Sequence, residues 1–152
     1  MRRKDKAIMD LALIDSIMKE AEICRLALCE DNEPYIVPMN FGYDQGYLYV
    51  HSAKEGKKID ILRRNNKVCF EVDINTELVR NEKICEWGMK YYSVIGKGQV
   101  TVLTDIEKKI QALNKIVEKY TDKSFDFTER QLNNIEVLEI KINELTGKKS
   151  GY

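Results

Sequence analysis

The chain contains little histidine, tryptophan or proline: one, one and two residues respectively among 152. Its four cysteines, Cys24, Cys29, Cys69 and Cys85, have none of the paired short spacings of a zinc site, and a chain of this size does not require disulfides. We therefore expect no metal centre and four reduced thiols, mostly buried in strands. Patterns for a Ser/His/Asp set, a Walker loop and a dinucleotide fingerprint are also absent, which argues against hydrolases and nucleotide hydrolases.

The chain also lacks an excess of either charge and a long apolar run. Its 25 basic and 25 acidic side chains cancel, so no general field would attract nucleic acid or an anionic membrane. No apolar segment approaches the roughly 20 residues that cross a bilayer, and Asp10 and Asp15 interrupt the segment that follows the basic N-terminus. We expect a soluble, cytoplasmic protein with one domain over residues 1–152, in which residues 1–22 form an N-terminal arm and helix.

The hydrophobic pattern predicts a mainly β, antiparallel domain with flanking helices. Strand patterns occur at residues 23–30, 35–43, 47–52, 67–73, 91–103 and 135–142, and helical patterns at 11–21, 56–64 and beyond a capping box at 104–107. The first three strands are expected to form two consecutive hairpins, and the polar segment 74–86 a loop or a poorly regular segment. Gly96 and Gly98 suggest a bend where a sheet curls. A small closed or split barrel follows from this order.

A candidate anion site follows the third strand. His51 ends that strand, and Gly56, Lys57 and Lys58 open the next helix. Lysines in a first helical turn oppose the helix dipole unless an anion sits there, so a phosphate would resolve the conflict. The alternative is that the lysines belong to the solvated face of the helix. Similarly, His51 is either the one candidate for proton transfer near neutral pH or a structural histidine.

Two further segments could contact a ligand. Pro38 lies inside a strand pattern, which indicates an edge strand that either turns free backbone groups toward a ligand or has no such role. Trp87, Met89, Tyr91 and Tyr92 gather aromatic and thioether surface into a few residues. They form part of a core, or they cover a flat ring or a neighbouring subunit.

Several of these motifs together resemble one family, the pyridoxamine 5′-phosphate oxidase-like, FMN-binding split β-barrel proteins, and within it the branch of the 5-nitroimidazole resistance (Nim) proteins. The resemblance covers nearly the whole chain. It is carried by Cys-Arg-Leu-Ala at 24–27, Val-Pro-Met-Asn-Phe-Gly-Tyr at 37–43, His-Ser-Ala at 51–53 with Gly-Lys-Lys at 56–58, Val-Cys-Phe-Glu-Val at 68–72, and Tyr-Ser-Val-Ile-Gly-Lys-Gly at 92–98.

The resemblance implies a homodimer with two FMN sites at its interface, each built from both chains. By this analogy Lys57 and Lys58, the Gly56 amide and the Ser52 hydroxyl, with Ala53 beside them, hold the phosphate. The isoalloxazine lies along the backbone of Pro38, Met39, Asn40 and Phe41, and the partner contributes Trp87 and Tyr91 or Tyr92. His51 lies near the flavin as the catalytic residue.

The implied function is an FMN-dependent oxidoreductase that acts on a small electron-poor substrate, such as a 5-nitroimidazole, with a reduced nicotinamide as a possible donor. The chain lacks the C-terminal arginine/histidine set of the vitamin B6 oxidases, which argues against that substrate. The alternative is a non-catalytic protein of the same fold that holds FMN, or haem with His51 as axial ligand. FAD and haem are less favoured than FMN.

Overall fold

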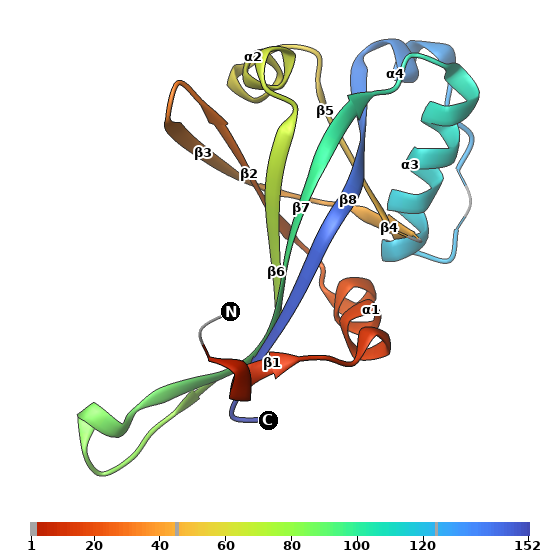
Figure 1. Ribbon diagram of the computed structural model, residues 1–152. Helices are drawn as coiled ribbons and strands as arrows, with labels where there is room; N and C mark the ends of the chain where they lie inside the picture. The colour runs from red at the N-terminus through yellow and green to blue at the C-terminus, as the bar shows by residue number, and fades with distance from the viewer. Residues whose placement is uncertain (1–2, 45, 124) are drawn as a thin grey trace.

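The computed structural model describes residues 3–44, 46–123 and 125–152. Its elements are short helices and strands of very different length, with the four strands β2 to β5 in succession (Figure 1). In chain order they are η1 (Lys4–Lys6), β1 (Ala7–Ile8), α1 (Leu11–Glu20), β2 (Cys24–Glu30), β3 (Glu33–Met39), β4 (Gly42–Asp44), β5 (Tyr47–Ala53), α2 (Lys57–Arg64), β6 (Lys67–Val79), η2 (Ile84–Glu86), β7 (Gly88–Val102), α3 (Ile106–Tyr120), α4 (Glu129–Asn133) and β8 (Ile135–Ser150).

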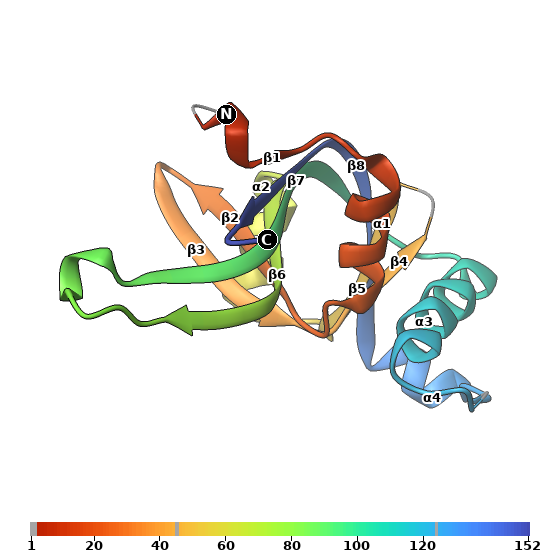
Figure 2. The same cartoon turned by 90° about the horizontal axis from the view of Figure 1, so that it is seen from below.

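The strands form one antiparallel sheet in the order β3-β2-β6-β7-β8-β5-β4, and β1 pairs with β8. The sheet curls strongly, as the view along its strands shows (Figure 2). The sheet does not close, because its two edge strands, β3 and β4, do not pair with each other. These two strands are nevertheless consecutive in the chain. The predicted split β-barrel with flanking helices is therefore confirmed.

The two consecutive hairpins predicted for residues 23–52 are only partly correct. β2 pairs with β3, and β4 pairs with β5, but β5 has β8 as its other neighbour rather than β3. The predicted strand 35–43 is two strands, because the chain leaves one sheet edge after Met39 and joins the opposite edge at Gly42. We call residues 39–42 the crossover.

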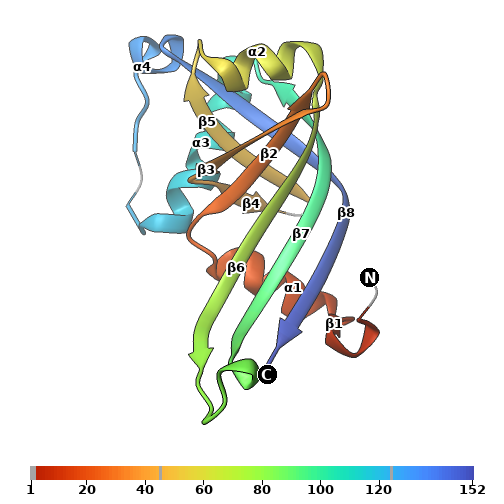
Figure 3. The same cartoon turned by 90° about the vertical axis from the view of Figure 1, so that its left-hand side faces the viewer.

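Alternating side chains of the strands fill the barrel. Leu26 in β2, Phe70 in β6 and Val50 in β5 are fully buried, as expected for a sheet with one face on a core. Gly96 in β7 leaves room for Phe70, since a Cβ at this position would lie 2.1 Å from the Phe70 ring. Helices α1 and α2 lie at opposite ends of the barrel (Figure 3), and both contribute buried side chains to this core.

A second, smaller core lies between α3 and the sheet. It contains Leu103, Ala112, Leu113, Ile116, Leu132 and Val137.

The capping box predicted at 104–107 is wrong. The N-cap of α3 is Asp105, whose carboxylate accepts a hydrogen bond of 2.9 Å from the Lys108 amide, and the capping box is instead made by Thr128 and Gln131 at the start of α4. The helix therefore begins one residue later than the capping box would place it, with an aspartate in place of the threonine as N-cap.

Strands β6 and β8 extend well past their predicted ends, and β7 begins before its predicted start. The segment 74–86, predicted to be a loop or poorly regular, is strand in its first part, because β6 continues to Val79 through an irregular step at residues 74–77, where Asn75 has φ of 54°. The ends of β6 and β7, with η2 between them, form a hairpin that projects from the barrel (Figures 1 and 2). We call residues 77–90 the arm.

The cysteines differ from the expectation as well. Cys24 is buried and Cys69 is half-buried, whereas Cys29 and Cys85 are exposed, so the thiols are not mostly buried. All four are free.

Within the described residues, none of the helices has the length and apolarity needed to span a bilayer.

Candidate functional site

The two lysines that open α2 lean toward β3. The Lys58 Nζ lies 3.2 Å from the Met39 Sδ, and the Lys57 Nζ lies 5.1 Å from the centre of the Tyr35 ring. Helix α2 starts at Lys57, directly after Gly56, whose φ of 116° is a non-helical conformation that other residues rarely adopt. No side chain caps this N-terminus. Both cations therefore lie at the positive end of a helix, beside the crossover.

His51 lies near Lys58, at the end of β5 and opposite Val137 of β8. It is partly exposed. Burial of the ring, followed by the positive charge of Lys58, lowers the pKa of His51 below its ordinary value of 6.5. Burial also lowers the pKa of Lys58. The imidazole is therefore neutral at pH 7, and its two nitrogens offer one donor and one acceptor.

The remaining predicted phosphate ligands lie around the same turn. Ala53 and Gly56 are exposed, and Ser52 is half-buried. Side chains alternate along a strand, so Ser52 and His51 point to opposite faces of β5. The structure thus places Lys58 near both Met39 and His51, with Ser52 directed to the other face of β5.

The crossover differs from the predicted arrangement in its backbone donors. Pro38 has no N–H, and the Phe41 amide donates a hydrogen bond of 3.0 Å to the Tyr120 hydroxyl. Phe41 itself is fully buried, whereas Asn40 is exposed. Met39 pairs with Cys24 at the end of the β2–β3 ladder, where its amide faces β2. Among the four residues predicted to offer amides to a ligand, Asn40 remains as the candidate.

The aromatic residues predicted to come from a partner lie on the arm or at its base. The Trp87 Nε1 donates to the Asn81 carbonyl at 2.9 Å, and 42% of the Trp87 side chain is exposed. Tyr92 stacks on Tyr152 with ring centres 4.7 Å apart, and the Lys148 Nζ lies 5.4 Å from the Tyr91 ring. Figures 1 and 3 both place the arm and α2 at opposite ends of the molecule. One chain therefore does not bring Trp87 to the two lysines.

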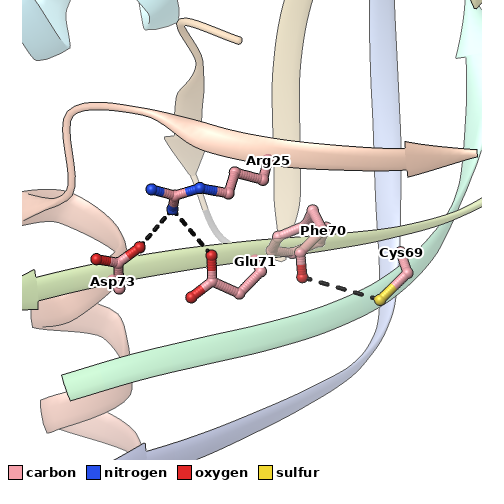
Figure 4. A network of polar contacts seen from close by, with 5 residues as sticks. All are labelled: Arg25, Cys69, Phe70, Glu71 and Asp73. Atoms are coloured by element: carbon pink, nitrogen blue, oxygen red, sulfur yellow. Dashed lines mark hydrogen bonds and ion pairs between the residues drawn. The ribbon is translucent and has the colours of Figure 1, made fainter. Parts of the chain in front are cut away.

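A charged network on the outer face of the sheet was not predicted (Figure 4). Arg25 of β2 donates to the Glu71 carboxylate at 3.0 Å and to the Asp73 carboxylate, both on β6. Burial, with the nearby Asp73 charge, raises the pKa of Glu71 although Arg25 opposes the shift. Strand register explains the network, since Arg25 and Glu71 are direct cross-strand partners.

The crossover contacts with Tyr120 and Lys119 were also missed. Both residues lie in the last turn of α3, and the Lys119 Nζ lies 4.1 Å from the centre of the Phe41 ring. Their partners are far away in sequence, with 79 positions separating Tyr120 from Phe41. The sequence signal was limited to an apolar stripe that includes Tyr120.

Comparisons with known proteins agree with the fold and the resemblance. A structure from Bacteroides thetaiotaomicron VPI-5482, described as a candidate 5-nitroimidazole antibiotic resistance protein, is 35% identical with a TM-score of 0.86, covering 94% of this chain and 86% of that one. An FAD and haem binding protein from Mycobacterium smegmatis is 19% identical with a TM-score of 0.85, covering 97% of this chain and 74% of that one, and shows the fold alone.

A curated relative, an uncharacterized protein of Rhizobium meliloti (strain 1021), is 34% identical over 65 residues, which is 43% of this chain and 42% of that protein. The match therefore spans less than half the length of that relative. The family model described as pyridoxamine 5′-phosphate oxidase matches residues 10–149, nearly the whole chain. This chain belongs to the pyridoxamine 5′-phosphate oxidase family.

Proposed function

We propose that the chain is a homodimeric, FMN-dependent oxidoreductase that reduces a small electron-poor substrate, with 5-nitroimidazoles as the first class to test. The observation that carries the flavin site is the half-buried Lys58 ammonium, which faces the thioether of Met39. A thioether is a weak acceptor. A phosphate would give this cation, Lys57 and the uncapped N-terminus of α2 a strong acceptor.

The residues present fit a flavin mononucleotide in charge and in position. A dianionic phosphate at Lys57 and Lys58 would leave the ring system to lie along the neighbouring crossover, where Asn40 keeps a candidate backbone donor. Membership of a family that typically binds flavins supports this assignment. The 35% identical relative described as a candidate 5-nitroimidazole resistance protein supports the substrate class.

When bound, the flavin would supply hydride acceptance and electron transfer. The chain itself would supply binding and orientation. His51 is neutral at pH 7 because its pKa is lowered, so its Nδ1 and Nε2 would orient a substrate through hydrogen bonds or accept a proton. Lys58 would bind the phosphate and keep the imidazole neutral until the phosphate offsets its charge.

The arm supports the dimeric arrangement in this proposal. Trp87, with Tyr91 or Tyr92, would come from one protomer to the flavin site of the other, because one chain holds them at the end opposite α2. Each site would then need both chains. A reduced nicotinamide is the proposed electron donor.

Titration of the flavin-free protein with FMN tests the phosphate assignment. Lys57→Ala and Lys58→Ala should each weaken FMN binding by roughly tenfold to 150-fold, because each removes a charge-assisted hydrogen bond of about 1.5–3 kcal/mol. Arg63→Ala is the matched control, since Arg63 lies at the other end of α2 and pairs with Asp60. If the double lysine variant binds FMN as tightly as the Arg63 variant, the phosphate site is elsewhere.

A second candidate function is a haem- or flavin-binding protein without fast turnover. The neutral imidazole of His51 favours it, because a histidine must be deprotonated to coordinate a metal. The absorption spectrum of the purified protein separates the two: flavin bands favour the reductase and a Soret band favours haem. His51→Ala should abolish a Soret band but leave most of the FMN bound.

A further inference from the structure

The crossover is the part of the barrel that strand pairing supports least. It leaves β3 at one sheet edge and enters β4 at the other, and β4 is three residues long. Main-chain pairing with β2 ends at Met39, and pairing with β5 begins at Gly42. The position of residues 40 and 41 therefore depends on side chains from other elements.

The Tyr120 hydroxyl makes two hydrogen bonds, one as acceptor and one as donor. The oxygen accepts from the Phe41 amide at 3.0 Å, and the hydroxyl donates to the Glu22 carbonyl at 2.6 Å. The second bond ties the crossover to the segment between α1 and β2. One hydroxyl thus fixes both the orientation of the Phe41 peptide and its distance from the end of α1.

Lys119 holds the same region from a second direction. Its Nζ donates to the carbonyls of Met18 and Lys19 at 2.8 Å each, in the last turn of α1. A cation is favourable at the C-terminal end of a helix. The same Nζ lies 4.1 Å from the centre of the buried Phe41 ring, within the range of a cation–π interaction. Burial lowers the pKa of Lys119 to about 8, so the amine is still largely protonated at pH 7.

The backbone of α3 also lies directly against the crossover. A Cβ added at Gly42 would come within 2.6 Å of the Lys115 carbonyl carbon and oxygen. This close approach sets the last turns of α3 at a fixed distance from the chain as it enters β4. Lys119 and Tyr120 therefore act from a rigid support.

We propose that Lys119 and Tyr120 are positioning residues of the flavin site, which hold the crossover so that the Phe41 peptide faces α3 and the Asn40 backbone faces the ligand. This inference rests on the proposed function, because it assigns a role at the same site. On the opposite side, Lys58 contacts the crossover at Met39. The crossover is thus held between α2, which carries the phosphate lysines, and α3, which sets its orientation.

Tyr120→Phe tests the proposal because it removes the hydroxyl and keeps the ring. The Phe41 amide then loses its acceptor, so the variant should bind FMN about five- to tenfold more weakly, and the visible absorption bands of the bound FMN should shift. In the flavin-free protein, hydrogen exchange of the Phe41 amide should become faster. Tyr49→Phe is the matched control, because Tyr49 packs against the α3 core and its hydroxyl makes no hydrogen bond within the described residues.

A second pair of variants tests Lys119 and covers the case in which Tyr120→Phe does not fold. Lys119→Met should weaken FMN binding and shift the same bands, and Lys119→Arg should restore both, since arginine keeps the charge and the donors. A purely structural role would lower the melting temperature of the variants and leave the bands of bound FMN unchanged.

The outcomes separate this proposal from the one on which it rests. If wild type binds FMN and the Tyr120 and Lys119→Met variants bind it with the same affinity and the same spectrum, the positioning role is wrong while the flavin site stands. If wild type binds no FMN, the proposed function fails, and the positioning role fails with it. Band shifts and weaker binding in these variants, but not in Tyr49→Phe, support the proposal.

Discussion

His51 is the single histidine of the chain, and its charge state depends on one neighbouring side chain. Partial burial of the ring and the positive charge of Lys58 both favour the neutral imidazole. Lys57 comes next to Lys58 in sequence but lies over the Tyr35 ring instead. Two adjacent lysines of the proposed phosphate site thus have different electrical effects on the same histidine.

We predict that the His51 pKa, measured from its ring proton signals by NMR, lies below 6.5, and that Lys58→Met raises it. Lys57→Met is the control and should leave the value near that of wild type. Because the folded-state pKa is the lower one, the unfolded chain binds more protons below about pH 6.5, and stability should fall as the pH drops through this window. A His51 pKa that is unchanged by Lys58→Met but raised by Lys57→Met would contradict the geometry of α2.

Local signals explain which site residues the sequence could indicate. Gly56 must adopt a positive φ and the helix begins directly after it, so the position of Lys57 and Lys58 at a helix N-terminus follows from neighbouring residues. Tyr120 carries no such signal. Its hydroxyl partners, Phe41 and Glu22, are 79 and 98 positions away, and only the curled sheet brings them together.

At the scale of elements, Gly96 determines how β7 passes over the barrel core. A Cβ here would lie 2.1 Å from the ring of Phe70, which is fully buried and has no space to move into. The pairing of Phe70 with Gly96 across β6 and β7 places an aromatic ring over a residue without a side chain. The glycine is thus required by the core and not by backbone conformation.

We predict that Gly96→Ala lowers the free energy of unfolding by about 1–3 kcal/mol, the usual cost of overpacking a core. Urea unfolding followed by circular dichroism measures the change. Gly88→Ala in the same strand is the control, because its added Cβ would have no neighbour within 4 Å. Equal stability of the two variants would show that the ring of Phe70 relaxes without cost.

The sequence predicted the presence of most of the longer elements, and the pairing of neighbouring strands such as β2 and β3, but not the lengths of the longest strands or the distant strand partners. Alternation within β2, β5 and the first half of β6 reports a buried face, so those strands were found. The second half of β6 is polar because it leaves the core, and alternation no longer marks it. In β8, Ile142 and Leu145 still pack on the core, but an irregular step in the pairing with β7 between them breaks the alternation. The pairing of β5 with β8 joins segments about 90 residues apart, which no local pattern encodes.

For the whole molecule, the arm is the feature that a single chain does not explain. Pairing of β8 with β7 ends at Tyr91, and pairing of β2 with β6 ends at Glu71, so Glu77–Lys90, Leu78–Met89 and Val79–Gly88 form a two-stranded ribbon. Such a ribbon is marginally stable in water on its own. Leu78, Ile84, Trp87 and Met89 are each at least 42% exposed on it. A ribbon with this much exposed apolar surface needs a partner surface, and a second copy of the chain is the partner proposed above.

We predict that the wild-type protein sediments as a dimer and that Trp87→Ser with Met89→Ser shifts it toward monomer. Burying each of these side chains contributes about 1.5–3 kcal/mol, so the dimer dissociation constant should rise at least 100-fold for the pair. Analytical ultracentrifugation over a range of concentrations measures the shift. Ile106→Ser is the control, because Ile106 is 52% exposed but lies at the start of α3, away from the arm.

The same variants also test whether the arm completes the flavin site. If each site takes Trp87 from the partner, FMN affinity of the arm variant should fall together with dimer formation, and raising the protein concentration should recover only the part of the loss that comes from dissociation. The remainder would be the contribution of the indole itself. A dimer that persists in the arm variant, with unchanged FMN affinity, would place both the interface and the ring-facing aromatic residues on another surface of the barrel.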